Sequence, residues 1–278
     1  MTERVTSYRH DGLVFDVRDE GPLHGPVVVL LHGFPQRASS WDGVVPLLHA
    51  AGCRTVAPDQ RGYSRGARPR GRSAYRMSAL VGDTVALVAA LGGAPVHLVG
   101  HDWGAGVAWS TAASRPDLVT SLTSVSVPHP AAFIRSLRRG TQLRKSWYMF
   151  VFQLPWLPER VLGRRAFAES EMRKGGMPPA AVARLWPEIV ADGALPGGLA
   201  YYRAIPFPGP RVLRSRVRVP TTHVWSDRDV ALDRYGAELT ASYVDAPYRL
   251  EVLEGVSHWI PDEVPERLAG IILERVSS

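Results

Sequence analysis

The sequence is poor in the features that mark secreted, membrane-spanning and repetitive proteins. Its 278 residues include a single cysteine, Cys53, so an intrachain disulfide is excluded. No apolar run approaches the ~18 residues that a membrane span needs, and the run Val27–Leu31 ends at His32. The first residues are polar and lack the apolar core of a secretion signal. We therefore expect a cytoplasmic protein without membrane association.

Acidic residues are scarcer than basic ones. There are 26 Asp and Glu against 33 Lys and Arg, a formal net charge of +7, and the excess is concentrated between Ala131 and Ser215. These basic residues are not interleaved with the aromatic motif of any nucleic-acid-binding module, so we expect no nucleic-acid partner. Spacings typical of metal ligands are missing, and we expect neither a metal nor an organic cofactor. The sequence is compatible with a homodimer.

Short β-branched runs alternate with helical patterns through most of the chain. The predicted strands are Val14–Val17, Val27–Leu31, Cys53–Ala57, Val96–Gly100, Leu122–Val127, Thr221–Trp225 and Tyr248–Leu253. The predicted helices are Arg76–Leu91, Trp103–Ser114, Leu232–Val244 and Pro261–Glu274. This alternation predicts an α/β fold, with a mostly parallel sheet and helices on both of its faces.

The alternation stops between Ala131 and Ser215, where the pattern changes to helices and proline-rich turns. We interpret residues 131–215 as an inserted helical lid that divides the core into residues 1–130 and 216–278. In such sheets a ligand binds beyond the carboxyl ends of the strands. The motifs described next all follow a predicted strand, which is where this rule places a binding site.

The segment Gly100–Gly104 lies between a predicted strand and a predicted helix and has the pattern Gly-x-nucleophile-x-Gly. Its glycines allow a sharp turn that holds the central side chain clear of the backbone. That central residue is Asp102, which we predict to be the nucleophile. A helix N-cap is the purely structural alternative for such an aspartate.

An aspartate nucleophile restricts the chemistry. A carboxylate that attacks an ester or amide forms an anhydride that readily reverts. A carboxylate that attacks an sp³ carbon bearing a leaving group forms a stable alkyl ester, which water must then hydrolyse. Epoxides and alkyl halides are substrates of this kind.

The remaining catalytic groups follow in the chain order nucleophile, acid, histidine. His258, after the strand Tyr248–Leu253, is the predicted base that deprotonates the hydrolytic water. Asp227 and Asp229 both follow the strand that ends at Trp225. We choose Asp229 as the orienting acid, because the loop needs some residues to turn back toward the histidine. Asp227 is expected to pair with Arg228 at the surface.

Two backbone amides are predicted to form an oxyanion hole. The N–H of Trp103 stands at a helix N-terminus, where negative charge is favoured. The N–H of Phe34 follows the strand Val27–Leu31. Together they would stabilise the tetrahedral intermediate at the Asp102 carbonyl.

Taken together, these motifs resemble the epoxide hydrolases of the α/β-hydrolase fold, over nearly the whole chain. The motifs that carry the resemblance are His32-Gly33-Phe34-Pro35 with Trp41, Pro58–Tyr63, Gly100–Gly104, Val127–Pro130 and Ser257–Trp259. The resemblance implies a mostly parallel eight-stranded sheet with helices on both faces and a helical lid. It also implies substrate contacts for His32, Pro35, Trp41 and Phe152.

In epoxide hydrolases two lid tyrosines donate hydrogen bonds to the epoxide oxygen. The first typically stands four residues before a Phe-Gln-x-Pro segment, which here begins at Phe152 and points to Tyr148. The second typically lies in an aromatic-Tyr-Arg segment, here Tyr201-Tyr202-Arg203, which points to Tyr202. A second tyrosine that is common in the first motif is missing from residues 149–151.

The predicted function is hydrolysis of a small-molecule epoxide by water to a vicinal diol, through a covalent aspartyl ester. The related haloalkane and haloacetate dehalogenases share the core motifs and remain an alternative. Haloalkane dehalogenases usually have Asn where Phe34 stands, and haloacetate dehalogenases usually have Arg where Trp103 stands. A non-catalytic ligand-binding protein on the same fold is a third alternative.

Overall fold

The computed structural model describes residues 3–205 and 216–278. In them an eight-stranded sheet has the order β1-β2-β4-β3-β5-β6-β7-β8. The pairs β1–β2 and β2–β4 are antiparallel, and the strands from β4 to β8 run parallel. The strands are β1 (Ser7–His10), β2 (Leu13–Glu20), β3 (Val27–Leu31), β4 (Arg54–Pro58), β5 (Val96–His101), β6 (Val119–Val125), β7 (Thr221–Ser226) and β8 (Tyr248–Leu253).

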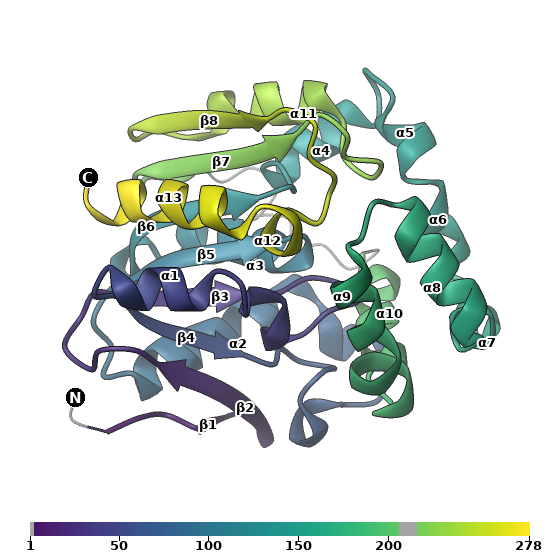
Figure 1. Cartoon of the computed structure of the whole chain (residues 1–278), viewed down its shortest axis with the longest axis horizontal. Helices are drawn as coiled ribbons and strands as arrows, with labels where there is room; N and C mark the ends of the chain where they lie inside the picture. The colour runs from purple at the N-terminus through teal and green to yellow at the C-terminus, as the bar shows by residue number, and fades with distance from the viewer. Residues whose placement is uncertain (1–2, 206–215) are drawn as a thin grey trace.

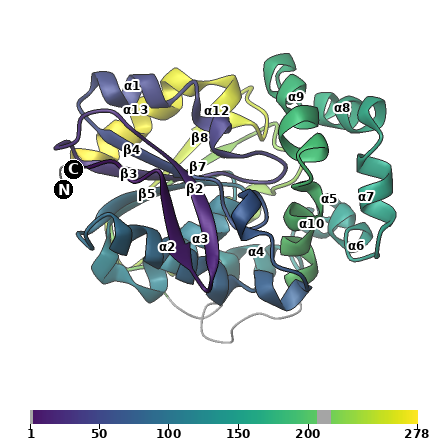
Figure 2. The ribbon, with the colours of Figure 1, turned by 90° about the horizontal axis from the view of Figure 1, so that it is seen from below.

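Helices cover both faces of the sheet (Figure 2). One face is covered by α1 (Val45–Ala50) and α13 (Pro265–Val276), next to α12 (Ile260–Glu263), and the other by α2 (Met77–Ala90) and α3 (Trp103–Ser114). The remaining core helices are α11 (Arg234–Leu239) and the 3₁₀ turns η1 (Ala38–Trp41), η2 (Arg65–Ala67), η3 (Arg72–Tyr75), η4 (Pro116–Leu118) and η6 (Thr240–Tyr243). The predicted α/β-hydrolase fold is confirmed.

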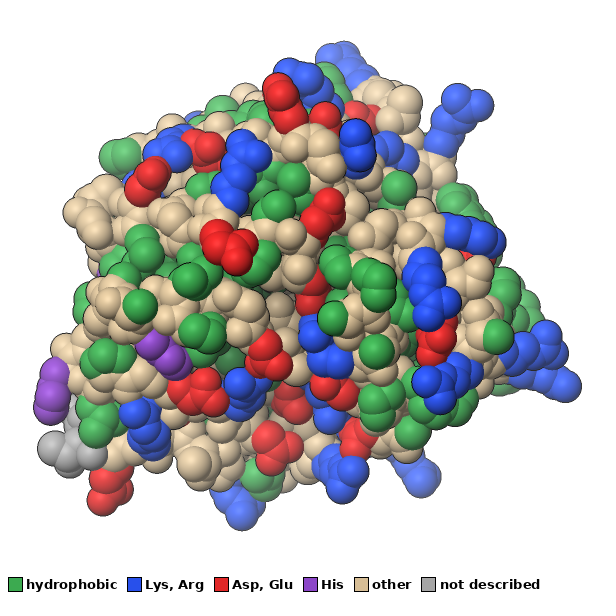
Figure 3. Space-filling view, in the orientation of Figure 1, with side chains coloured by type: hydrophobic (Ala, Val, Ile, Leu, Met, Phe, Trp, Pro, Cys, Tyr) green, Lys and Arg blue, Asp and Glu red, His purple; other side chains and the backbone are tan. Residues whose placement is uncertain are grey.

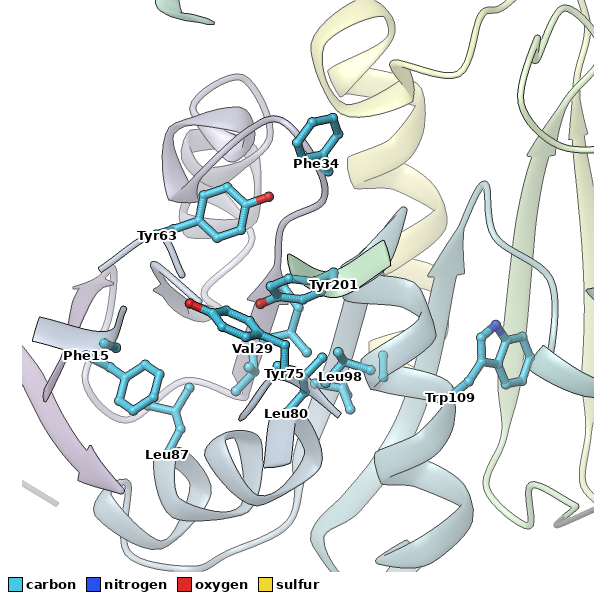
Figure 4. Close-up of a cluster of buried hydrophobic side chains, with 14 of the residues drawn as sticks. Phe15, Val29, Phe34, Tyr63, Tyr75, Leu80, Leu87, Leu98, Trp109 and Tyr201 are labelled. Carbon is cyan, nitrogen blue, oxygen red and sulfur yellow. The ribbon is translucent and has the colours of Figure 1, made fainter. Parts of the chain in front are cut away.

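Strand β3 shows how the sequence builds two hydrophobic layers from one continuous apolar run. Successive side chains of a strand point to opposite faces. Val28 and Leu30 accordingly pack in the cluster under α1 and α13, whereas Val29 and Leu31 pack in the larger cluster with α2 and α3. Figure 4 shows part of this larger cluster, in which Leu80 of α2 lies near Leu98 and Leu87 of α2 lies near Phe15.

The chain between β6 and β7 forms a helical insertion, which we call the lid. Its helices are α4 (Pro130–Ser136), α5 (Gln142–Lys145), α6 (Trp147–Val151), α7 (Leu157–Leu162), α8 (Arg165–Lys174), α9 (Pro179–Leu185), the π-helix η5 (Trp186–Ala191) and α10 (Leu195–Ala204). Most of the lid lies at the end of the molecule remote from both termini (Figure 1). The predicted end of the lid at residue 215 lies outside the described residues.

Several predicted element boundaries are wrong for local physical reasons. Strand β1 was not predicted, and β2 is longer than expected because Asp19 is buried in an ion pair with Arg54 of β4. Strand β6 ends at Val125, since Ser126 has a φ of +69°. The single helix expected over 261–274 is divided before Pro265, which has no N–H to continue α12.

Helix α1 was also missed, and the helix expected over 232–244 is shorter. It is divided into α11 and the 3₁₀ turn η6. Among the described residues, no helix is long and apolar enough to span a membrane.

Candidate active site

Asp102 stands at the sharp turn between β5 and α3, with a φ of +51° and a ψ of −119°. A non-glycine residue in this region is strained, and such strain is typical of functional positions. The flanking glycines make the turn possible. A Cβ on Gly100 would lie 2.3 Å from the carbonyl oxygen of Gly104, and a Cβ on Gly104 would lie 2.1 Å from that of Leu31. The predicted elbow is therefore present, and its two glycines are required by close backbone contacts.

The carboxylate of Asp102 is buried against the loop that follows β3. Its Oδ1 accepts a hydrogen bond of 2.7 Å from the backbone N–H of Phe34. Gly33 allows this approach, because a Cβ there would lie only 2.4 Å from the Cβ of Asp102. Trp103 is the first residue of α3, so its amide belongs to the helix N-terminus beside the carboxylate. Its place in an oxyanion hole stays a prediction.

His258 connects this carboxylate to a second one. Its Nδ1 lies 2.7 Å from Oδ2 of Asp229, and its Nε2 lies 3.7 Å from Oδ2 of Asp102. The other oxygen of Asp229 accepts hydrogen bonds from the amides of Ala231 and Leu232, at 2.7 and 2.8 Å. The orienting carboxylate is thereby fixed, and the imidazole is directed toward Asp102.

The two aspartates after β7 differ in position, and the difference favours Asp229 as the orienting acid. Asp229 is buried and contacts His258, whereas Asp227 is exposed and accepts a hydrogen bond of 2.7 Å from the amide of Gly255. The expected pairing of Asp227 with Arg228 is wrong, because the carboxylate is used to close the turn after β8.

The charges of the site are mutually dependent. Burial alone lowers the pKa of His258, but the nearby carboxylates of Asp229 and Asp102 outweigh this effect and raise it to about 10. Burial alone raises the pKa of Asp102, but the contact with His258 outweighs it and the net shift is downward. At neutral pH an imidazolium therefore lies between two carboxylates, and Asp102 is ionised.

A second histidine, His101, supports the first. Its Nε2 lies 2.9 Å from the backbone carbonyl oxygen of His258, and Ser126 Oγ donates to the same oxygen at 3.1 Å. Burial lowers the pKa of His101 to about 4, so its ring is neutral at pH 7 and adds no charge to the site. The two rings lie 5.0 Å apart. Sequence reasoning assigned no role to either His101 or Ser126.

The lid supplies two phenols to the cavity that Asp102 lines. This cavity has a volume of about 500 Å³, and Tyr148 of α6 and Tyr202 of α10 both line it. Their rings lie 5.9 Å apart. Burial raises the pKa of both hydroxyls, and the charge of Asp102 adds to the rise. Both phenols are therefore neutral hydrogen-bond donors at any ordinary pH.

The neighbouring tyrosine has a different place. Tyr201 donates a hydrogen bond of 2.8 Å to the backbone oxygen of Arg61 and is buried in the core cluster, where Figure 4 shows it beside Tyr75. Its ring lies 6.1 Å from that of Tyr63. Consecutive residues of a helix point about 100° apart, so only one of the two reaches the cavity. The structure places Tyr202 there, as predicted.

Hydrogen bonds join the two lid segments that carry the tyrosines. Gln153 Nε2 donates to the carbonyl oxygen of Tyr202 at 2.7 Å, and Arg203 donates to the carbonyl oxygens of Phe152 and Leu154 at 3.0 and 2.7 Å. Arg203 also pairs with Glu159. The motif residues Gln153 and Arg203, to which sequence reasoning gave no role, thus hold the two tyrosines at a fixed separation.

None of the four side chains predicted to contact substrate is found on the cavity wall. Trp41 is completely buried in the cluster under α1 and α13. His32 is also completely buried, and its Nε2 accepts a hydrogen bond of 3.0 Å from the amide of Gln60. Pro35 follows Phe34 in the same loop and does not line the cavity either. Their predicted substrate contacts are corrected accordingly, since His32 and Pro35 flank Phe34 in its loop and Trp41 belongs to the core under α1 and α13.

Phe152 lies behind the tyrosines. Its ring packs edge-on against those of Tyr148, Tyr202 and Phe34, at centroid distances of 5.5, 5.0 and 5.7 Å. It supports the phenols and is not among the cavity-lining residues. Sequence reasoning missed most of the apolar lining, which comes from scattered positions: Met77, Val127, Phe133, Ile134, Leu137, Leu143, Met149, Ile205 and Leu232.

The described residues contain no group of three or more His, Cys, Asp or Glu side chains arranged to hold a metal ion.

Comparison with known proteins agrees with this geometry. The family model for the alpha/beta hydrolase fold matches residues 26–265. The chain is 34% identical to epoxide hydrolase 3 of Xenopus tropicalis over 95% of this chain and 75% of that protein. It is 32% identical to human epoxide hydrolase 4 over 93% of this chain and 74% of that protein. The crystal structure of an epoxide hydrolase from Vigna radiata superimposes with a TM-score of 0.82 at 28% identity, over 99% of this chain and 97% of that one.

Proposed function

The chain belongs to the epoxide hydrolases of the α/β-hydrolase fold family, and from this premise we propose that it converts an epoxide to a vicinal diol through a covalent ester on Asp102. One observation carries the proposal. A single apolar cavity is lined by an ionised carboxylate from the core and by two neutral phenols from the lid. These are the groups needed to attack an epoxide carbon and to protonate the departing oxygen.

In the first step an oxygen of Asp102 attacks one ring carbon. Oδ1 is occupied by the Phe34 amide, so Oδ2 is the oxygen free to attack. The C–O bond of the ring breaks, and the developing alkoxide accepts a hydrogen bond, and then a proton, from Tyr148 or Tyr202. The product is a hydroxyalkyl ester of Asp102. A phenol suits this task because it donates a proton without first carrying a charge.

Formation of the ester changes the state of His258. The carboxylate of Asp102 holds the pKa of this imidazole up, and esterification removes that charge. The pKa of His258 should therefore fall in the intermediate, so that the imidazole can release its proton to the tyrosinate left by the first step and become a base. The first step thus prepares the base for the second step.

In the second step His258, oriented by Asp229, takes a proton from water, and the hydroxide attacks the ester carbonyl of Asp102. The negative charge then develops on Oδ1, where the Phe34 N–H already donates at 2.7 Å. Collapse of this intermediate breaks the bond to the diol oxygen, which takes up the proton that His258 removed from water. The second hydrogen of that water is left on the Asp102 carboxyl group and passes to His258, which restores the carboxylate and the imidazolium. The resting geometry supports this sequence, because the amide is in position before the reaction begins.

Trapping of the ester tests the proposal. In a His258→Gln variant the first step should proceed and the second should not, so incubation with styrene oxide should add the mass of one substrate to the intact protein. Peptide mapping should place the added mass at Asp102, and the Asp102→Ala variant should gain none. The proposal would be contradicted if the folded His258→Gln protein formed no adduct and the wild type formed no diol from the same epoxide. Halide release from a haloalkane under those conditions would favour the dehalogenase alternative.

A further inference from the structure

The outer surface of the lid exposes large apolar side chains. The exposed fractions are 64% for Trp147 and Phe150 of α6 and 71% for Trp156 before α7. Leu143, Leu154 and Leu157 are exposed in the same stretch of chain. We call these six residues the lid patch. Helices α5, α6 and α7, which carry or flank them, follow one another at the end of the molecule remote from both termini (Figures 1 and 2). Large exposed apolar side chains gathered in one region usually mark an interaction site.

The active-site cavity opens onto this patch. Leu143 and Phe150 belong to the patch and also line the cavity. The exposed side chains of Ile134 and Ile205 line the cavity too, although they are not part of the patch. An apolar molecule can therefore pass from the patch to Asp102 along a continuous apolar wall.

The surroundings of the patch are strongly basic. Between residues 131 and 165 the only acidic residue is Glu159, and it is paired with Arg203. Six exposed arginines of this stretch have no ion-pair partner among the described residues: Arg135, Arg138, Arg139, Arg144, Arg160 and Arg164. Figure 3 shows basic side chains projecting at the lid end of the molecule, with hydrophobic atoms between them.

We propose that the lid patch docks on the surface of an anionic lipid bilayer, and that apolar epoxides enter the cavity from the bilayer. The entry of substrate rests on the proposed function, whereas the docking does not. Exposed tryptophans favour the membrane interface, and arginines next to them are attracted by anionic headgroups. This proposal departs from the sequence-based expectation of no membrane association, because the exposure of the apolar residues is visible only in the folded chain.

Charge and geometry favour a bilayer over other occupants. A second copy of the chain in a symmetric contact would bring the same unpaired arginines together, and like charges repel. An acidic protein seated on the patch would cover the mouth of the cavity. A bilayer neutralises the arginines and leaves the mouth in contact with a phase that dissolves apolar epoxides.

Sedimentation with vesicles tests the docking. The full chain should bind vesicles of phosphatidylcholine with phosphatidylglycerol and should bind pure phosphatidylcholine vesicles weakly. Each arginine near an anionic surface strengthens binding by a few fold, so substitution of Arg138, Arg139 and Arg144 by Gln should weaken it on the order of 100-fold at low salt. The matched control replaces Arg9, Arg218 and Arg267 of the core, which are also exposed and unpaired among the described residues, and should bind like the wild type.

A second variant tests the apolar contribution. Trp147→Ser with Trp156→Ser removes the two most exposed tryptophans, neither of which lines the cavity. It should lose vesicle binding and keep its turnover of styrene oxide in buffer. Absence of any dependence on phosphatidylglycerol, or equal losses in the lid and core triple variants, would overturn the proposal. The proposal would also be overturned if the wild type did not bind vesicles and formed a dimer that the double tryptophan variant could not form. Vesicle binding is measured without substrate turnover. A failure of the docking proposal can therefore be distinguished from a failure of the proposed function.

Discussion

The two walls of the cavity hold their functional groups in different ways. On the core wall, the charged Asp102 lines the cavity, and the charged His258 lies behind it. A strained turn and the Phe34 amide hold Asp102, and a hydrogen bond from His101 to its backbone oxygen holds His258. On the lid wall, Tyr148 and Tyr202 are neutral and are held by ring packing and by hydrogen bonds between two short helices. In the proposed mechanism the core wall carries the nucleophile and the base, and the helical wall carries the proton donors.

This division suits the chemistry. A nucleophile must be placed within a few tenths of an ångström of its line of attack, because misplacement by 1 Å can cost about 100-fold in rate. The sheet and its elbow supply that precision. A hydrogen-bond donor tolerates more variation, so helices that also shape the substrate pocket can carry it.

The largest effect is expected at the core wall. Asp102→Ala removes the atom that forms the covalent bond, and turnover of styrene oxide should fall by about 10⁴-fold or more, as for other nucleophiles that act as part of a unit. Diol formation followed by chromatography measures it. The folded state should persist, because Ala keeps the Cβ at this turn and the Asp102 side chain caps no amide of α3. Diol formation within about tenfold of the wild type would show that Asp102 is not the nucleophile.

A smaller effect is expected at the lid wall. Tyr148→Phe and Tyr202→Phe each remove one donor while the ring packing stays, and each should lower kcat by about 10²- to 10³-fold. Tyr201→Phe is the matched control, since this hydroxyl bonds to the oxygen of Arg61 away from the cavity and its loss should affect stability more than rate. If the control lowered kcat as much as the other two, the phenols would have no specific role in protonating the epoxide oxygen.

The same comparison explains what the sequence could predict. The core groups lie in short motifs that directly follow strands, and parallel strands bring their carboxyl ends together. Asp102, His258 and Asp229 could therefore be placed next to one another from chain order alone. Their surroundings could not be read in this way: Gly33 is required by the proximity of Asp102, a residue far away in the sequence, and His101 acts through the backbone of His258.

The lid was predictable only through the family resemblance. Tyr148 and Tyr202 were identified by motif position, whereas helical spacing alone does not show which tyrosine faces the cavity. Trp41 shows the limit of assigning residues by motif position, because this motif residue packs in the hydrophobic core and does not contact the cavity. The apolar lining comes from many separate elements. Which side chains line the cavity depends on how the lid helices pack, and no local sequence pattern encodes that packing.

The charges of the core wall predict a pH-dependent stability. The pKa of His258 is raised to about 10 in the folded protein, against about 6.5 in an unfolded chain. Proton binding therefore stabilises the folded state fully below about pH 6.5, and this contribution is lost as the pH rises through about 10. The free energy of unfolding should differ most between wild type and His258→Gln at about pH 6.5, and the difference should shrink steadily toward about pH 10.

Urea denaturation at a series of pH values measures this difference. His97→Gln is the control, since burial lowers the pKa of His97 and leaves it neutral throughout this window. A wild-type to His258→Gln difference that stays constant from neutral pH to about pH 10 would show that no imidazolium lies between the two carboxylates.

The smallest effect is expected where the lid is joined to the core. Asp192, between η5 and α10, pairs with Arg37, Arg65 and Arg68 of the core. Burial alone raises its pKa, but these arginines outweigh burial and lower it to about 2. Asp192→Asn should therefore cost about 1–3 kcal/mol in the free energy of unfolding at neutral pH. This loss should vanish as the pH falls from about 4 toward about 2, where the wild-type carboxylate also loses its charge.

Asp117→Asn is the matched control, because its pair with Arg115 is exposed and should contribute nothing measurable. Since α10 also carries Tyr202, loosening this junction should act on the lid wall and leave the core wall intact. Asp192→Asn should then retain the ester-trapping reaction of Asp102 in a His258→Gln background, with a higher substrate concentration needed for half-maximal trapping. A variant that binds substrate as tightly as its parent would show that the lid phenols are positioned without the help of this junction.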